Sequence, residues 1–219
     1  MTPLIKAQSL SRVFSHTGHH QALHGFSAEL HTGQLVGLSG SSGTGKSTLL
    51  HILGALDIGY EGSAQLNAVE LKSMSEQHRA ELRRNKVSLA FQTPHLFPHL
   101  TVHENIDLSA RIAGTHEHQT FNSEVLIERF GLKRLLGSTP AMLSGGEKRR
   151  VGIVQALSRP ACVYLLDEPS VHLDALIRDE LFRVLRELKA HDKLVVFSSH
   201  SQEDLACADV VYDLKVAAS

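Results

Sequence analysis

The sequence predicts an α/β fold with a doubly wound parallel sheet, an antiparallel edge sheet and an inserted block of helices. The last third alternates unbroken apolar runs with a segment of helical periodicity, as expected for strands buried on both faces of a parallel sheet. A glycine-rich loop at residues 40–48 follows a short apolar run and leads into a Leu- and Ile-rich segment, giving the order strand, loop, helix. Alternating strands and helices indicate an α/β core.

The first 92 residues contain the loop and the expected edge sheet. Ala22–Leu30 and Gly62–Leu71 are strand candidates set off by glycines and turn residues, which favours antiparallel pairing. The other elements expected here are a strand at Gln34–Ser39, a helix at Lys46–Ala55, a helix at Glu76–Arg84 and a strand at Val87–Phe91 that stops at Gln92.

The middle of the chain reads as three helices. They are expected from a capping box at Thr101 and Glu104 to about Ala113, over Asn122–Phe130, and from after Ser144-Gly145-Gly146 to before Pro160, with Gly114 and Gly131 ending the first two. This block separates two strand-rich regions. We therefore expect one domain, 1–219, with a core of residues 1–92 and 159–219 and a helical subdomain of residues 93–158.

The last third supplies the remaining core elements. Strands are expected at Cys162–Leu166, Leu194–Ser198 and Val210–Leu214. Apolar residues recur at helical spacing between the first two strands, at Leu173, Ile177, Leu181, Val184 and Leu188. That stripe predicts a helix packed on the sheet. Ser201 and Asp204 are expected to cap a short helix.

The glycine-rich loop has the composition of a phosphate-binding site. Gly40, Gly43 and Gly45 leave the backbone open, so successive N–H groups can turn toward phosphate oxygens at a helix N-terminus. Lys46 would neutralise the β- and γ-phosphates and Ser47 would bind Mg²⁺. The candidate contacts are Gly40, Ser41, Ser42, Gly43, Thr44, Gly45, Lys46, Ser47 and Thr48. The full spacing favours a nucleoside triphosphate site over a glycine-rich turn beside an unrelated lysine.

Two acids follow a buried strand at the edge where this loop is expected. Asp167 and Glu168 come directly after the apolar run Cys162–Leu166, and ligands of open α/β sheets bind at the carboxyl ends of strands. Asp167 would hold Mg²⁺ opposite Ser47, while Glu168 would orient or deprotonate the water that attacks the γ-phosphate. The competing interpretation is a solvated acidic turn, which the five preceding apolar residues disfavour.

Two more polar residues end apolar strands. Gln92 could reach the metal or the attacking water, and His200 could hydrogen-bond the γ-phosphate or that water. Taken alone, each is equally consistent with an ordinary polar residue at a strand end.

A second glycine pair begins a helix far from the loop. Ser144, Gly145 and Gly146 in the segment Leu143–Glu147 make a second anion site by the same backbone and dipole argument. One nucleotide does not need two such helices, so the sequence predicts that a second chain supplies one of them.

Composition excludes several classes of protein. The 219 residues are 42% hydrophobic and 21% charged, with 22 Lys and Arg against 23 Asp and Glu. No net basic field exists to attract nucleic acid, and no stretch approaches the roughly 20 apolar residues of a membrane span. Cys162 and Cys207 lie in apolar contexts and the N-terminal residues lack a signal-peptide pattern, so we expect a cytosolic protein.

These motifs, in this order, resemble the ATP-binding cassette (ABC) family of transporter motor subunits. The residues that carry the resemblance are Phe14, Gly40–Thr48, Gln92, Leu143–Glu147, Val163–Glu168, Ser170–Asp174 and His200. The resemblance implies a P-loop NTPase core of the RecA-like type, ATP and Mg²⁺ as ligands, and Phe14 stacked on adenine. It further implies two copies meeting head to tail, transmembrane permease partners, and a peripheral position on the cytoplasmic face of the inner membrane.

A narrower resemblance points to one branch of that family. His51–Asp57, Arg79–Arg84 and Leu96–Thr101 are similar to the lipoprotein-release and macrolide-export branch. The departures from the family pattern are Gln155 in place of Arg, Lys148-Arg149 in place of a glutamine-containing pair, Phe14 in place of Tyr and His172 in place of Asn.

Other hypotheses stay open at this point. An ATP-gated scaffold of a membrane or cell-wall complex would share every motif, whereas a soluble cassette acting on nucleic acid is disfavoured by the near-neutral charge. Fifteen histidines include a cluster at His16, His19, His20 and His24 and a pair at His116 and His118. Without defined geometry, solvated turn residues are favoured there over a metal site.

Overall fold

The computed structural model describes residues 2–14, 20–113 and 120–214, and it contains a five-stranded parallel sheet. The strands are β3 (Leu35–Ser39), β6 (Val87–Ala90), β7 (Val163–Leu166), β8 (Leu194–Ser198) and β9 (Val210–Asp213). Their order is β6-β7-β8-β3-β9, and every neighbouring pair is parallel. All residues of β7 and β8 are buried, because helices or a second sheet cover both faces. The expected α/β core is confirmed.

The second sheet is antiparallel and has the order β2-β1-β4-β5. Its strands are β1 (Ile5–Phe14), β2 (His20–Leu30), β4 (Glu61–Leu66) and β5 (Val69–Glu70). The prediction of one strand over Gly62–Leu71 is wrong, because the chain turns back at Asn67 and Ala68. Both have positive φ, 51° and 62°, the geometry of a two-residue hairpin turn. Leu71–Ser73 then forms a 3₁₀ turn.

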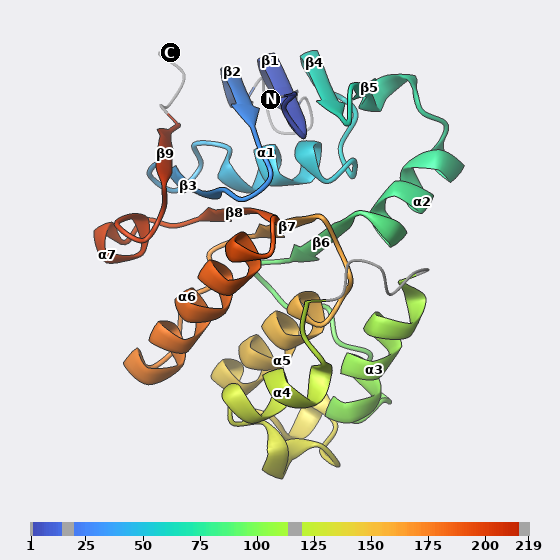
Figure 1. The fold of residues 1–219 in the computed structure, drawn as a ribbon, viewed down its shortest axis with the longest axis vertical. Helices are drawn as coiled ribbons and strands as arrows, with labels where there is room; N and C mark the ends of the chain where they lie inside the picture. The colour runs from blue at the N-terminus through green and yellow to red at the C-terminus, as the bar shows by residue number, and fades with distance from the viewer. Residues whose placement is uncertain (1, 15–19, 114–119, 215–219) are drawn as a thin grey trace.

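Helix α1 (Lys46–Leu53) lies between the two sheets (Figure 1). Leu49, Leu50 and Ile52 are at most 1% exposed and share one apolar cluster with residues of both sheets. The helix stops at Gly54, close to the predicted end at Ala55. Burial of α1 on both sides fixes the loop that precedes it.

Six further helices are present in the described part of the chain, and α3, α4 and α5 lie together on the far side of the parallel sheet (Figure 1). They are α2 (Glu76–Asn85), α3 (Val102–Ile112), α4 (Ser123–Arg129), α5 (Gly145–Leu157), α6 (Ala175–Ala190) and α7 (Gln202–Leu205). The capping box at Thr101 and Glu104 is confirmed. Gly131 follows α4 with a φ of 65°, as predicted for a helix-ending glycine. Gly114 is outside the described residues.

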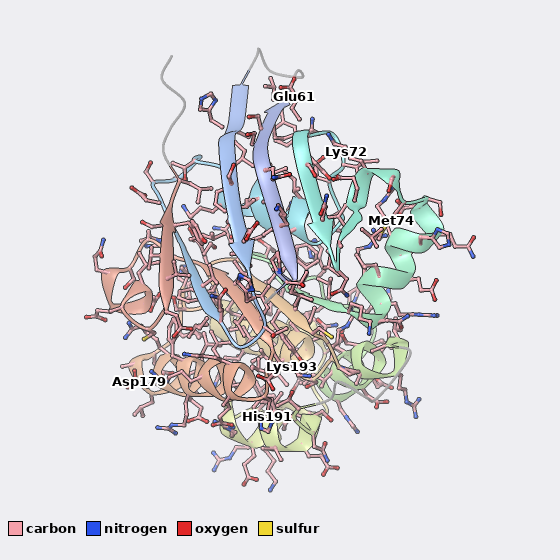
Figure 2. The ribbon with its side chains drawn as sticks, turned by 45° about the horizontal axis from the view of Figure 1, so that its top comes forward. Glu61, Lys72, Met74, Asp179, His191 and Lys193 are labelled. Atoms are coloured by element: carbon pink, nitrogen blue, oxygen red, sulfur yellow. The ribbon has the colours of Figure 1, made fainter. Side chains whose placement is uncertain are left out.

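The helix α6 packs on the sheet through the predicted stripe. Leu181, Val184 and Leu188 are fully buried, and the ring of Phe182 meets that of Phe197 in β8 edge-on at 5.3 Å. Leu173 precedes the helix, which begins after Asp174. Its polar side lies outward, where Figure 2 labels Asp179.

The predicted cap of α7 is wrong. Ser201 occupies the N-cap position but makes no side-chain cap bond. Asp204 is instead 1% exposed and accepts hydrogen bonds from Ser170, Ser199 and Arg178. Tertiary partners have therefore replaced the local capping bond.

Among the described helices, none combines the length and the apolar composition needed to cross a membrane.

Candidate functional site

The glycine-rich loop joins β3 to α1 and requires glycine at its end. Gly45 has a φ of 91°, and a Cβ there would lie 1.9 Å from the carbonyl oxygen of Ala22. Only glycine fits that close approach of loop and β2. The buried Lys46 side chain donates from Nζ to the carbonyl oxygens of Gly40 (2.7 Å) and Ser41 (3.0 Å). The ammonium is thus held inside the loop.

The loop forms one wall of an open pocket of about 250 Å³. Its lining residues come from segments far apart in the sequence: Phe14, Ala22, Ser42, Gly43, Gly45, Lys46, Ser47, Thr48, Gln92 and Glu168. The fold therefore brings most of the residues singled out from the sequence to one cavity. Gly40, Ser41 and Thr44 belong to the same loop without lining it, and Thr44 Oγ1 donates to the carbonyl of Ser41 at 2.9 Å.

The two acids at the end of β7 diverge. Asp167 is buried, and its Oδ1 accepts a hydrogen bond from Ser198 Oγ at 2.6 Å. The N–H of Glu168 donates to the same Ser198 Oγ at 2.7 Å. Glu168 has a φ of 45°, a left-handed conformation that is strained for a residue with a side chain. Such an outlier at a cavity is typical of a functional position.

The other two side chains predicted to be catalytic lie beside Glu168. Gln92 Nε2 donates to Glu168 Oε2 at 3.2 Å, and His200 Nδ1 lies 3.7 Å from Glu168 Oε1. His200 is otherwise largely exposed. The ends of β6, β7 and β8 thus converge on one carboxylate.

Phe14 stands at the rim of the pocket, 38% exposed. The guanidinium carbon of Arg12 lies 4.4 Å from the centre of its ring, a cation–π contact. Arg12 is itself held by Asp57 at 2.8 Å. The aromatic ring therefore has a fixed neighbour on one side.

Ser144, Gly145 and Gly146 do not line this pocket in the described chain. Ser144 caps α5, with its hydroxyl and backbone N–H both bonded to Glu147. These hydrogen bonds hold the pKa of Glu147 below its ordinary value, first through the Ser144 hydroxyl and then through its N–H. The second helix start that the sequence singles out is thus preformed and separate from the pocket.

Sequence reasoning missed two residues that shape the site. Ser198 joins Asp167 to Glu168; its only signal was a polar side chain at the end of an apolar strand. Arg149 was noted only as a departure from the family pattern, yet its guanidinium reaches the ends of β6 and β7.

Of the clustered histidines, the structure describes the side chain of His24 alone, and it is exposed. His16, His19, His116 and His118 are outside the described residues, and nothing is described of the His20 side chain. Within the described ranges, no group of three or more His, Cys, Asp or Glu side chains is arranged to hold a metal.

A glycine-rich loop between a parallel strand and a buried helix, facing acids at the end of a neighbouring strand, defines the class of P-loop nucleotide-binding α/β proteins. The chain belongs to the ABC transporter family, whose model matches residues 23–171.

Several relatives of the chain are named as export proteins. The chain is 37% identical to a probable export ATP-binding/permease protein of Pseudomonas fluorescens, over 97% of this chain and 33% of that protein. It is 34% identical to the macrolide export ATP-binding/permease protein MacB of Shigella flexneri, over 98% of this chain and 34% of that protein. The chain thus spans about a third of the length of the curated relatives it matches.

Solved structures share the fold across nearly the whole chain. The ATP-binding cassette MJ0796, in a dimeric post-hydrolysis state bound to ADP and Pi, superposes with a TM-score of 0.87 at 26% identity, covering 96% of this chain and 94% of that one. An ATP-binding subunit of an ABC transporter gives 0.83 at 28% identity, covering 96% and 85%.

Proposed function

We propose that the chain binds and hydrolyses ATP as the motor subunit of an ABC transporter, pairing with a second copy to drive transmembrane permease subunits of the export type. The observation that carries this proposal is the single pocket where the phosphate loop meets Gln92 and Glu168. Residues 93–158 would be the helical subdomain that passes the motion on.

The loop would bind the triphosphate and Glu168 would act on water. Backbone N–H groups of residues 40–48 and the partial positive charge of α1 favour phosphate, and Lys46 would leave its carbonyl partners for the β- and γ-phosphates. Phe14 would stack on adenine. Gln92, bonded to Glu168 at 3.2 Å, would hold that carboxylate while it orients or deprotonates the attacking water. His200 would contact the γ-phosphate from the neighbouring strand end.

The donor set also fits Mg²⁺. A hydroxyl (Ser47), a carboxylate (Asp167) and an amide oxygen (Gln92) are the hard oxygen ligands that this ion prefers. Asp167 keeps a carboxylate oxygen beyond the one bonded to Ser198. When bound, the ion supplies positive charge to the β- and γ-phosphates.

A second copy would complete the site. Ser144–Gly146 form an N-terminal helix site outside their own chain's pocket, so they are available to a γ-phosphate held by a partner. The dimeric state of the MJ0796 cassette supports this arrangement. The γ-phosphate would then join the two copies, and hydrolysis would release them.

The names of the relatives support a permease partner. They are named ATP-binding/permease proteins, and the chain matches only about a third of them, so a membrane part would be separate from the described residues. We propose a peripheral position on the cytoplasmic face of the inner membrane, with no role on nucleic acid.

Replacement of Lys46 by Ala tests the proposal. Loss of a charge-assisted contact worth about 1.5–3 kcal/mol should weaken ATP affinity by at least about tenfold and abolish turnover, measured by equilibrium binding and phosphate release. Lys133→Ala removes an exposed lysine of the helical block and should change neither. Unchanged affinity in folded Lys46→Ala would refute nucleotide binding by this loop.

A further inference from the structure

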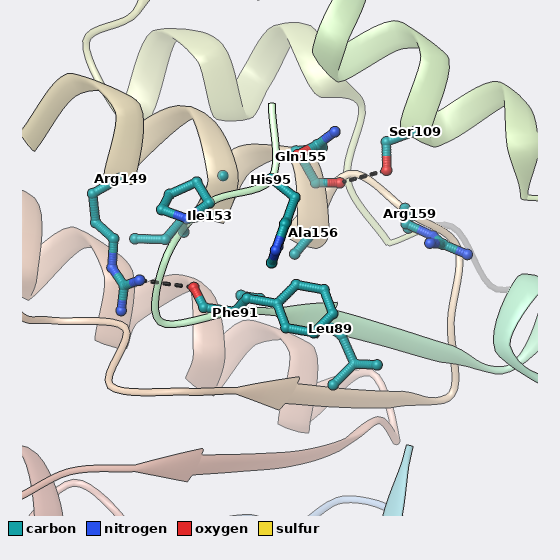
Figure 3. Close-up of a pocket in the computed structure, with 12 residues that line it drawn as sticks. Leu89, Phe91, His95, Ser109, Arg149, Ile153, Gln155, Ala156 and Arg159 are labelled. Carbon is teal, nitrogen blue, oxygen red and sulfur yellow. Dashed lines mark hydrogen bonds between the residues drawn. The ribbon is translucent and has the colours of Figure 1, made fainter. Parts of the chain in front are cut away.

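Arg149 lies one turn into α5 with its side chain buried, 6% exposed. Its Nη1 donates to the carbonyl of Phe91 at 2.8 Å and also to that of Gln92. Its Nη2 donates to the carbonyl of Asp167 at 2.7 Å and also to that of Glu168. Figure 3 shows the guanidinium directed at the Phe91 carbonyl from the α5 side.

A single planar guanidinium therefore bridges the ends of two parallel strands. Removing this charge from water is costly, and burial lowers the pKa of Arg149, with the charges of Asp167 and Glu168 acting in the opposite direction. The compensation comes from four carbonyl dipoles. The planar guanidinium carries N–H donors on both of its terminal nitrogens, so it can bond to both loops at once.

The next turn of α5 lies in close contact with the segment that follows Gln92. A Cβ on Gly152 would lie 2.7 Å from Cβ of Pro94, so the segment after Gln92 rests directly on the helix. Arg149 and Gly152 together set the distance between α5 and this segment.

We propose that Arg149 is a positioning residue for hydrolysis, which fixes Gln92 and Glu168 relative to the helix that begins at Ser144. This inference rests on the proposed function. Because Ser144 would contact ATP held by a second copy, Arg149 would connect the partner's site to the glutamate of its own chain within about one helical turn.

Loss of Arg149 should lower the rate of ATP turnover without weakening nucleotide binding. Arg149 does not line the pocket of the phosphate loop, so its loss should leave nucleotide affinity intact. Glu168 is held in a strained left-handed conformation, and it should relax when its carbonyl loses the guanidinium. Misplacement by about 1 Å can reduce a rate by about 10²-fold.

The experiment compares Arg149→Lys and Arg149→Met with Arg150→Met. Lysine keeps the charge without the fork, and methionine keeps neither. Arg150 is the neighbouring arginine, partly buried, with one bond to the Phe130 carbonyl at 3.1 Å. We expect both Arg149 variants to lose at least about tenfold in kcat with KM and ATP affinity within about threefold, and the control to stay near wild type.

Unchanged kcat in a folded Arg149 variant would overturn the proposal. An equal loss of affinity and kcat would also overturn it, because it would mark a purely structural role. If neither Arg149 variant folds, Gly152→Ala provides the test. The added methyl group should push Pro94 away from α5 and lower kcat without changing ATP affinity. Unchanged kcat in Gly152→Ala would count against the proposal.

Hydrogen exchange of the nucleotide-free protein gives a readout independent of turnover. The amides of residues 92, 93, 95, 168, 170 and 171 should exchange faster in Arg149→Lys or Gly152→Ala than in Arg150→Met. Equal exchange in these segments would overturn the positioning role. A wild-type protein that does not hydrolyse ATP would instead refute the proposed function, and the exchange measurement would then show only whether Arg149 fixes the two segments.

Discussion

Asp204 shows how one buried carboxylate can hold several loops at the edge of the site. Its Oδ1 accepts from Arg178 Nε at 2.7 Å, and its Oδ2 accepts from Ser199 Oγ at 2.7 Å and from Ser170 Oγ. Ser170 lies two residues after Glu168, and Ser199 immediately precedes His200. The carboxylate therefore ties together the segments that follow β7 and β8.

Asp204→Asn should destabilise the protein by about 2–4 kcal/mol, because it removes one partner of a buried charged network and leaves Arg178 without its closest carboxylate. Urea unfolding followed by circular dichroism measures this. The exposed Asp179→Asn on α6 is the matched control and should stay within about 0.5 kcal/mol of wild type. If Asp204→Asn lowers the free energy of unfolding by less than about 0.5 kcal/mol, the network adds nothing to stability.

At the scale of the element, helix starts are set by local chemistry. In α3, Glu104 Oε2 accepts from the Thr101 N–H at 2.7 Å and from its hydroxyl at 2.8 Å. These bonds, the backbone one first, hold the pKa of Glu104 below its ordinary value of 4.5. A carboxylate with a lowered folded-state pKa contributes stability above its unfolded pKa and loses it as the pH falls through the folded value.

Glu104→Gln should therefore lower Tm more at pH 7 than at pH 3. As the pH falls through the lowered pKa of Glu104, the wild-type carboxylate becomes protonated and its advantage over the amide shrinks. Thermal melts of both proteins across this range provide the measurement. A Tm difference of the same size at both values would contradict the electrostatic part of the capping box.

Elements with local signals could be predicted from the sequence, and those that depend on distant contacts could not. The cap at Thr101 lies within three residues of its partner, so spacing alone indicates it. Ser144 and Glu147 have the same spacing, although Ser144 was predicted only as part of an anion site. The turn at Asn67 and Ala68 was missed because alanine rarely adopts positive φ. Asp204 was expected to cap α7 because it lies near the start of that helix. Its actual partners lie 5 to 34 residues away and leave no pattern in the sequence that would predict them.

The candidate site also contains residues that the sequence could predict and residues that it could not. Motif spacing identified the loop, Gln92 and Glu168, and the fold brings them to one pocket. The contacts of Arg149 reach residues 57 and 58 positions away, just after β6, and residues 18 and 19 positions away, just after β7. No periodicity indicates a bond of that kind, since it depends on how α5 packs against the strand ends.

At the scale of the whole molecule, the proposed function requires two copies. Ser144 does not line the pocket that contains the phosphate loop, and in the proposed function a second copy supplies it to the nucleotide. ATP would then be buried between the copies, and its binding energy would be coupled to their association.

Sedimentation of Glu168→Gln in millimolar Mg-ATP tests this claim most directly, because the variant should bind ATP without hydrolysing it. We predict a species of twice the monomer mass that reverts to monomer when ATP is replaced by ADP or when Ser144→Arg is added. A Glu168→Gln protein that binds ATP and remains monomeric under these conditions would contradict the account.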